Sequence, residues 1–181
     1  MTLDRPTRQS MAGNAAGSGD TDQDSLVLGH FIPYRLSVLT NIVSRNLARV
    51  YADRFRLTVP EWRVLAVLGA NPGISANEVA EKSAMDKVMV SRAVDRLVRA
   101  KRLDRRQDTA DRRRSILEMS AEGKRIYDEI VPLALDYERD LLAALPARDL
   151  QRLDQILTRL QDRALALQPE TGEAQAEPEG V

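Results

Sequence analysis

Apolar residues recur at spacings of three and four along several stretches of this chain, which is the pattern of amphipathic helices. The longest stretch predicts a helix from near Pro33 to about Arg56, whose apolar face carries Leu36, Leu39, Val43, Leu47 and Val50. At ~1.5 Å per residue this helix would span ~35 Å, which is long for a small domain and suggests that a second subunit packs against it. A short helix over residues 61–68 follows, opened by Pro60 and ended by a turn at residues 71–73.

Two more short helices are predicted after this turn. Ser75 stands three positions before Glu78, the spacing of a capping box, and begins a helix through about Lys82. Asp86 can cap the next helix, which runs to about Lys101 and whose buried face carries Val90, Ala93, Val94, Leu97 and Val98. Two short helices joined by a tight turn are typical of a helix-turn-helix.

Two short strands are predicted at residues 103–106 and 115–119, around a charged turn. Such a hairpin after a helix-turn-helix is called a wing. Ser120 can cap a helix that extends to about residue 144 with a bend at Pro132, and Pro146 begins the last helix, with an apolar face of Leu150, Leu153, Ile156, Leu157 and Leu160. The predicted fold is mainly α with a small β-hairpin wing.

Two segments are predicted to be disordered. Residues 1–24 are rich in Gly, Ser, Ala, Asp and Thr without apolar periodicity, and residues 168–181 are acidic, with four Glu and no Lys or Arg. The residues between them, 25–167, are enough for one domain with a single core.

Positive charge is concentrated between Asp86 and Ser115, where eleven Lys and Arg residues stand against five Asp residues, a net charge of +6. The whole chain has 27 residues of each sign and no net charge, so the overall composition hides this segment. A neutral protein with one basic segment is typical of a protein that binds a polyanion there.

The helix after Asp86 presents side chains that suit DNA. Its outward residues are Lys87, Val88, Ser91, Arg92 and Asp95, with Met89 at the boundary. Most of them lie in the first half of the helix, the end that enters the major groove in helix-turn-helix proteins, where Lys and Arg pair with guanine and apolar groups contact the thymine methyl. The alternative is an ordinary solvated helix face.

The predicted turn of the hairpin carries Arg112, Arg113 and Arg114. Arginine suits a narrow, A·T-rich minor groove, and Asp111 could hold one of the three rigid while the others reach out. The alternative is a surface charge cluster with no ligand.

Three motifs in this order resemble the MarR family of winged helix-turn-helix regulators: Pro60-Glu61-Trp62-Arg63-Val64-Leu65, the run from Asp86 to Leu97, and Asp108-x-x-Asp111-Arg112-Arg113 followed by a strand and Ser120-Ala121-Glu122-Gly123. The resemblance implies an intertwined homodimer that represses nearby genes until a small ligand releases it. The residues expected to contact DNA are Ser75, Lys87, Val88, Met89, Ser91, Arg92, Arg96, Arg112, Arg113 and Arg114. Met89 departs from the small polar residue often found there, so no operator sequence can be transferred.

A homodimer is also expected from the residues themselves. The DNA-binding lobe would be residues 60–119, and the helices within 30–56 and 121–167 carry more aliphatic surface than this lobe can cover. The alternative is a monomer in which these helices pack on each other. In a two-fold dimer the recognition helices would lie one DNA turn apart, ~34–36 Å, on a pseudo-palindromic operator.

The start of the first helix is similar to that of regulators of hydroxycinnamate and related aromatic catabolism. This similarity implies an aromatic carboxylate effector, or its CoA thioester, clamped by Arg35 and lined by His30, Tyr34 and Trp62. The alternative is that Arg35 pairs with an acid and that Trp62 belongs to the core.

Several function classes find no motif here. The chain has no cysteine and one histidine, which argues against thiol chemistry and zinc sensing, and it has no nucleophile elbow, phosphate loop or zinc-protease motif. We therefore expect neither an enzyme nor a cofactor or metal, and no membrane partner; the expected location is the cytoplasm. The rival is a winged-helix interaction module or a nonspecific DNA binder, and the sequence does not separate a repressor from an activator.

Overall fold

The computed structural model describes residues 26–107 and 115–168. The chain divides into two compact units, Met1–Asn41 and Ile42–Val181. Helix α1 (Ile32–Phe55) begins in the first unit and ends in the second, within a residue of the bounds that the apolar pattern predicts.

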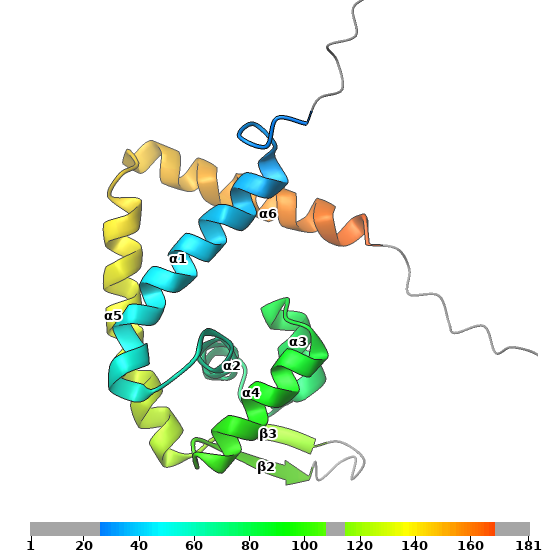
Figure 1. Cartoon of the computed structure of the whole chain (residues 1–181), viewed down its shortest axis with the longest axis vertical. Coiled ribbons are helices and arrows are strands. Elements are labelled where there is room, and N and C mark those ends of the chain that lie inside the picture. The colour runs from blue at the N-terminus through cyan, green and yellow to red at the C-terminus, as the bar shows by residue number, and fades with distance from the viewer. Residues whose placement is uncertain (1–25, 108–114, 169–181) are drawn as a thin grey trace, which may run out of the picture. The chain divides into compact units, whose positions relative to one another are not determined.

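The described part of the second unit contains the predicted helix-turn-helix and wing (Figure 1). Its elements after α1 follow in the order α2 (Val59–Ala70), β1 (Ile74–Ser75), α3 (Ala76–Ser83), α4 (Lys87–Arg99), β2 (Leu103–Gln107), β3 (Ser115–Met119), α5 (Ala121–Leu142) and α6 (Ala147–Ala166). The fold is mainly α with a small sheet, as predicted, and α2 is longer than the predicted 61–68 at both ends.

The sheet has three antiparallel strands in the order β1-β3-β2, where the sequence predicts only a hairpin. Strands β2 and β3 pair with Leu103 opposite Met119 and Gln107 opposite Ser115. Strand β1 pairs Ile74 with Leu117 and Ser75 with Ile116. A strand of two residues is too short to show alternation, so only its pairing with β3 reveals it.

The three predicted helix caps are confirmed. The Ser75 hydroxyl accepts from Glu78 N at 3.3 Å, the Asp86 carboxylate accepts from Met89 N at 2.7 Å, and the Ser120 hydroxyl accepts from Gly123 N at 3.0 Å. These bonds satisfy backbone donors that have no partner inside the helix, which sets where α3, α4 and α5 begin.

The core of the second unit is mostly aliphatic and fixes α4 in place. Val90, Ala93, Val94 and Leu97 of α4 are buried, as predicted, and they belong to one cluster with residues of α2, α3, the sheet and the first half of α5. Tyr51, Phe55 and Trp62 join this cluster, and burial raises the pKa of Tyr51 to about 12.

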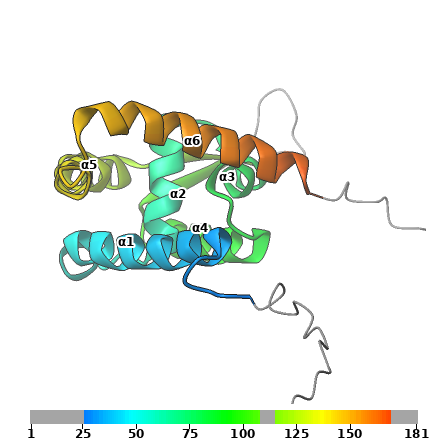
Figure 2. The same ribbon diagram turned by 90° about the horizontal axis from the view of Figure 1, so that it is seen from above.

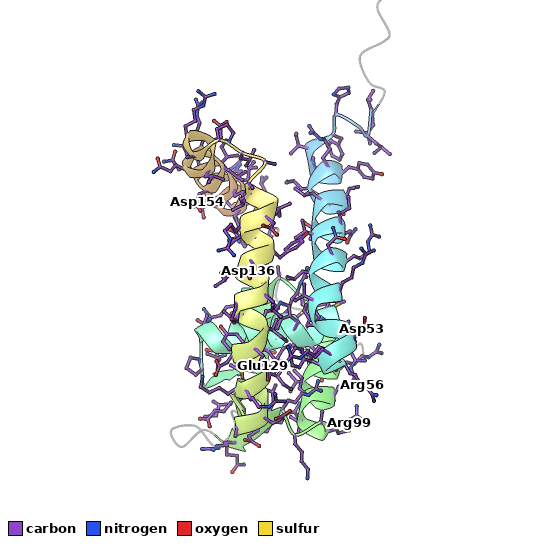
Figure 3. The ribbon with its side chains drawn as sticks, turned by 90° about the vertical axis from the view of Figure 1, so that its left-hand side faces the viewer. Asp53, Arg56, Arg99, Glu129, Asp136 and Asp154 are labelled. Atoms are coloured by element: carbon purple, nitrogen blue, oxygen red, sulfur yellow. The ribbon has the colours of Figure 1, made fainter. Side chains whose placement is uncertain are left out.

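Helix α5 continues through Pro132 and carries buried residues only in its first half. Near its start, the hydrogen bond from Arg125 lowers the pKa of Glu122. Further along the helix, Glu129 (Figure 3) pairs with Arg125 and with Arg54 at the end of α1. No helix among the described residues is long and apolar enough to cross a membrane.

Helix α6 runs away from the end of α5 (Figure 2). None of its residues is buried, although its outward apolar residues follow the predicted helical spacing: Ile156, Leu157 and Leu160 are all more than two-fifths exposed. The expected homodimer stays a prediction.

Candidate DNA-binding surface and effector pocket

The first half of α4 presents an exposed face of mixed chemistry on a firmly packed helix. Val88 is 60% exposed and Met89 42%, and Lys87, Ser91 and Arg92 are exposed beside them. The opposite face is buried against α2 and α3, so the outward side chains are carried by a rigid element (Figure 1). This arrangement can place hydrogen-bond donors and apolar groups against the base edges of a major groove.

The Lys and Arg side chains around this face differ in whether an acidic residue of the protein neutralises their charge. Arg105 Nη2 lies 2.8 Å from Asp95 Oδ1, and Arg106 Nη1 lies 3.3 Å from Glu118 Oε2. Neither Lys87 nor Arg92 pairs with an acid among the described residues. These two cations therefore keep their full charge for a negative partner.

Two residues predicted to contact DNA have partners within the protein. The Ser75 hydroxyl caps α3 and donates to Glu78 Oε2 at 2.7 Å. Arg96 Nε lies 3.1 Å from Glu61 Oε1, a carboxylate to which the sequence analysis gave no role. Glu61 follows Thr58 by three positions, which is again the spacing of a capping box. This spacing is the sequence signal that could have identified Glu61.

Arg112, Arg113 and Arg114 lie outside the described residues. The strands on either side of them are described, and they pair up to Gln107 and Ser115. A role for these arginines in DNA binding stays a prediction.

The residues predicted to bind an effector lie in both units. In the first unit Arg35 lines a pocket of about 360 Å³ with Ile32, Leu36 and Leu39, and His30 and Tyr34 are exposed. In the second unit Trp62 is buried, with ring contacts to Tyr51 at 5.6 Å and to Tyr127 at 6.0 Å. Trp62 is thus a core residue, which was the alternative expectation, and its contact with a ligand stays a prediction.

A second apolar pocket, which the sequence analysis did not anticipate, lies in the second unit. It has a volume of about 350 Å³ and lies between the later part of α1 and the later part of α5, lined by Val43, Leu47, Ala134, Leu135, Tyr137, Glu138, Leu141 and Leu142. The spacings of three and four in α5 are the signal that could have found it. Such an uncovered apolar groove between two helices can accept a small molecule or another apolar chain.

The segment from α2 to the wing matches a known family. A sequence model described as the MarR family matches residues 57–114, which contain the helix-turn-helix and the recognition face of α4. This part of the chain is similar to the MarR family. The fold is a winged helix and the chain is similar to transcriptional regulators, as the resemblance implied.

Proteins similar to this chain include regulators of known name. It is 23% identical over 122 residues to the transcriptional regulator HosA of Escherichia coli O157:H7, an alignment that covers 67% of this chain and 90% of the relative. The PcaV regulator of Streptomyces coelicolor, solved with its natural ligand, matches with a TM-score of 0.64 and 25% identity over 78% of this chain and 99% of that chain.

A third similar protein is a regulator that responds to a known small molecule. BpsR of Bordetella bronchiseptica, whose DNA binding is regulated by 6-hydroxynicotinic acid, matches with a TM-score of 0.68 and 21% identity over 77% of this chain and 99% of that chain. These relatives are regulators, not enzymes. No group of three or more His, Cys, Asp or Glu residues that could hold a metal ion occurs in residues 26–107 or 115–168.

Proposed function

We propose that this chain is a dimeric repressor that reads a pseudo-palindromic operator and leaves it when an aromatic carboxylate, or the CoA thioester of one, binds. The observation that carries the proposal is the exposed face of α4, where Lys87 and Arg92, which pair with no acid in residues 26–107 or 115–168, flank the apolar side chains of Val88 and Met89. The regulated genes would be those of aromatic-compound catabolism.

The chemistry of this face favours DNA over a protein partner. Lys and Arg donate to guanine O6 and N7, and an apolar side chain contacts the thymine methyl. Arg112, Arg113 and Arg114 of the wing would add phosphate or minor-groove contacts beside it. An acidic protein partner would use the charges but would have no use for the exposed Val88 and Met89 between them.

A homodimer is supported by apolar surface that the described residues leave exposed. In the first unit Ile32, Leu36 and Leu39 are at least 39% exposed, and α6 of the second unit has no buried residue. Exposed apolar faces of this kind mark interfaces, which a two-fold partner would cover. The dimer would also set the spacing of the two recognition helices.

The effector proposal rests on Arg35. Arg35 lines one pocket with the apolar residues Ile32, Leu36 and Leu39, a combination that suits a carboxylate attached to an aromatic ring. Tyr34 and His30 are neighbours in sequence and could add polar contacts. That BpsR responds to 6-hydroxynicotinic acid, an aromatic carboxylic acid, supports this class of ligand.

The test is a duplex-binding assay with the DNA upstream of the protein's own gene, at several salt concentrations, with and without aromatic acids and their CoA thioesters. A specific reader should prefer the operator to random duplex by roughly 10³-fold or more and lose affinity with a log–log salt slope near −0.9 for each phosphate that it neutralises. Release should follow one class of acid. Equal affinity for all duplexes would instead support a nonspecific binder, and absent binding an interaction module.

A further inference from the structure

Two consecutive residues of α4 form ion pairs with two different elements. Asp95 Oδ1 accepts from Arg105 Nη2 of β2 at 2.8 Å, and Arg96 Nε lies 3.1 Å from Glu61 Oε1 of α2. Successive residues on a helix point about 100° apart, since there are 3.6 per turn. The two pairs therefore restrain α4 from two directions.

The carboxylate of Glu61 is held in a fixed position. It is the one buried charged residue within the described ranges, and its Oε2 accepts from Thr58 N at 2.7 Å and from Thr58 Oγ1 at 2.6 Å. These bonds leave Oε1 directed at Arg96. A buried carboxylate is costly without a partner, so the pair with Arg96 is worth more than the Asp95–Arg105 pair, whose two side chains are about half exposed.

Arg96 lies at the edge of the outward face of α4. Residues four and seven apart lie on one side of a helix, which puts Val88, Arg92, Asp95 and Arg99 together on the exposed side. Arg96 lies four positions after Arg92 and seven after Met89, at the edge of this side, where its guanidinium reaches Glu61 of α2. Its side chain is still 48% exposed, so a phosphate could reach its terminal nitrogens and its role needs a test.

We propose that Arg96 is a positioning residue: Glu61 holds its guanidinium, and the pair sets the angle at which α4 meets the DNA. The Asp95–Arg105 pair is the second restraint and ties the same helix to the wing. This inference rests on the proposed DNA-binding function and gives Arg96 a role other than a direct DNA contact.

The first arm of the test uses the protein without DNA. Hydrogen–deuterium exchange of the α4 amides is compared in Arg96→Met, Glu61→Gln and the double variant, with Arg99→Met as the matched control. Arg99, at the end of α4 (Figure 3), bonds only to Asp95 O within its own helix among the described residues. We expect several-fold faster exchange in Arg96→Met, no further increase in the double variant, and unchanged exchange in Arg99→Met. Unchanged exchange in Arg96→Met would overturn the proposal whether or not the protein binds DNA.

The second arm measures binding to the operator and to random duplex across salt concentrations. Arg96→Met should weaken operator binding by about 10-fold, the effect of misplacing a base-reading side chain, and leave random-duplex binding and the salt slope unchanged. Arg92→Met should instead make the slope shallower by about 0.9 if Arg92 neutralises one phosphate. Equal weakening on both duplexes with a shallower slope in Arg96→Met would mean that Arg96 binds phosphate and would overturn the proposal. Wild type that binds both duplexes equally would refute sequence-specific reading, and the exchange arm would still decide the role of Arg96.

Discussion

Gly123 joins α5 to the DNA-binding lobe at a point where the structure leaves no room for a side chain. A Cβ at this position would lie 1.9 Å from the carbonyl oxygen of Arg102. The helix start cannot simply move away, because Ser120 N donates to Arg102 O at 3.1 Å, the Ser120 hydroxyl donates to Lys101 O at 2.7 Å, and Gly123 N donates to the Ser120 hydroxyl at 3.0 Å. Gly123→Ala must therefore break bonds that fasten α5 to the segment after α4.

The expected cost follows from these bonds. At an open helical position Gly→Ala stabilises a protein by up to ~1 kcal/mol. Here three hydrogen bonds, each with a net value of about 1 kcal/mol, would be strained or broken, so we expect a net destabilisation of about 2 kcal/mol or more. The clash is with backbone, which cannot rotate aside as a side chain can.

The assay is urea unfolding followed by far-UV circular dichroism at one fixed protein concentration. Alanine substitutions at two other glycines provide a comparison for the loss of stability. In Gly69→Ala the new Cβ would lie 2.3 Å from Tyr127 Cζ, a side chain that can shift, so the destabilisation should be smaller than in Gly123→Ala. Gly29 has nothing within 4 Å of a Cβ, so Gly29→Ala should stay within about 0.5 kcal/mol of wild type. A Gly123→Ala protein as stable as Gly29→Ala would refute the reasoning.

Four further outcomes are expected. Arg113→Ala should weaken operator binding and leave dimerisation intact, because the wing arginines would meet the DNA and not the partner; an unchanged gel shift would contradict this. Arg35→Ala should abolish release by the aromatic acid but not DNA binding, so a retained ligand response would remove Arg35 from the effector site. Leu160→Glu, which puts a charge on the exposed apolar face of α6, should shift the dimer toward monomer in light scattering, and an unaltered mass would argue against this interface. Because burial raises the pKa of Tyr51 to about 12, the unfolded state ionises first above about 10; stability should be full below pH 10 and fall toward pH 12, and a Tyr51→Phe protein with the same fall would refute it.

The local elements of this fold could be predicted because their signals lie within a few neighbouring residues. The apolar period indicated α1 and the buried face of α4 almost to the residue, and Ser75, Asp86 and Ser120 marked the starts of three helices. Pairings between distant residues could not be predicted in the same way. Strand β1 is recognised only by its pairing with Leu117 and Ile116, more than 40 positions further on.

The residues of the candidate site differ in the same way: some could be predicted from local sequence, and others depend on contacts between distant residues. The exposed residues Lys87, Val88, Ser91 and Arg92 follow from the period of one helix, and the structure exposes them. That Trp62 belongs to the core was only one of two interpretations until Tyr51 and Tyr127 were found against it. Glu61 and Arg96 lie 35 positions apart in the sequence, on two different helices, and no local sequence pattern predicts their ion pair.

By itself, the amino-acid sequence determined which segments form helices, where three of the helices start and which helix faces turn toward solvent. These features depend on backbone geometry over one or two helical turns. Only the tertiary structure decided which of the many charged side chains are neutralised within the protein and which keep their charge for a partner. The reason is that an ion pair depends on distances of a few ångströms between elements, and these distances are set by how α2, α4 and the sheet pack together.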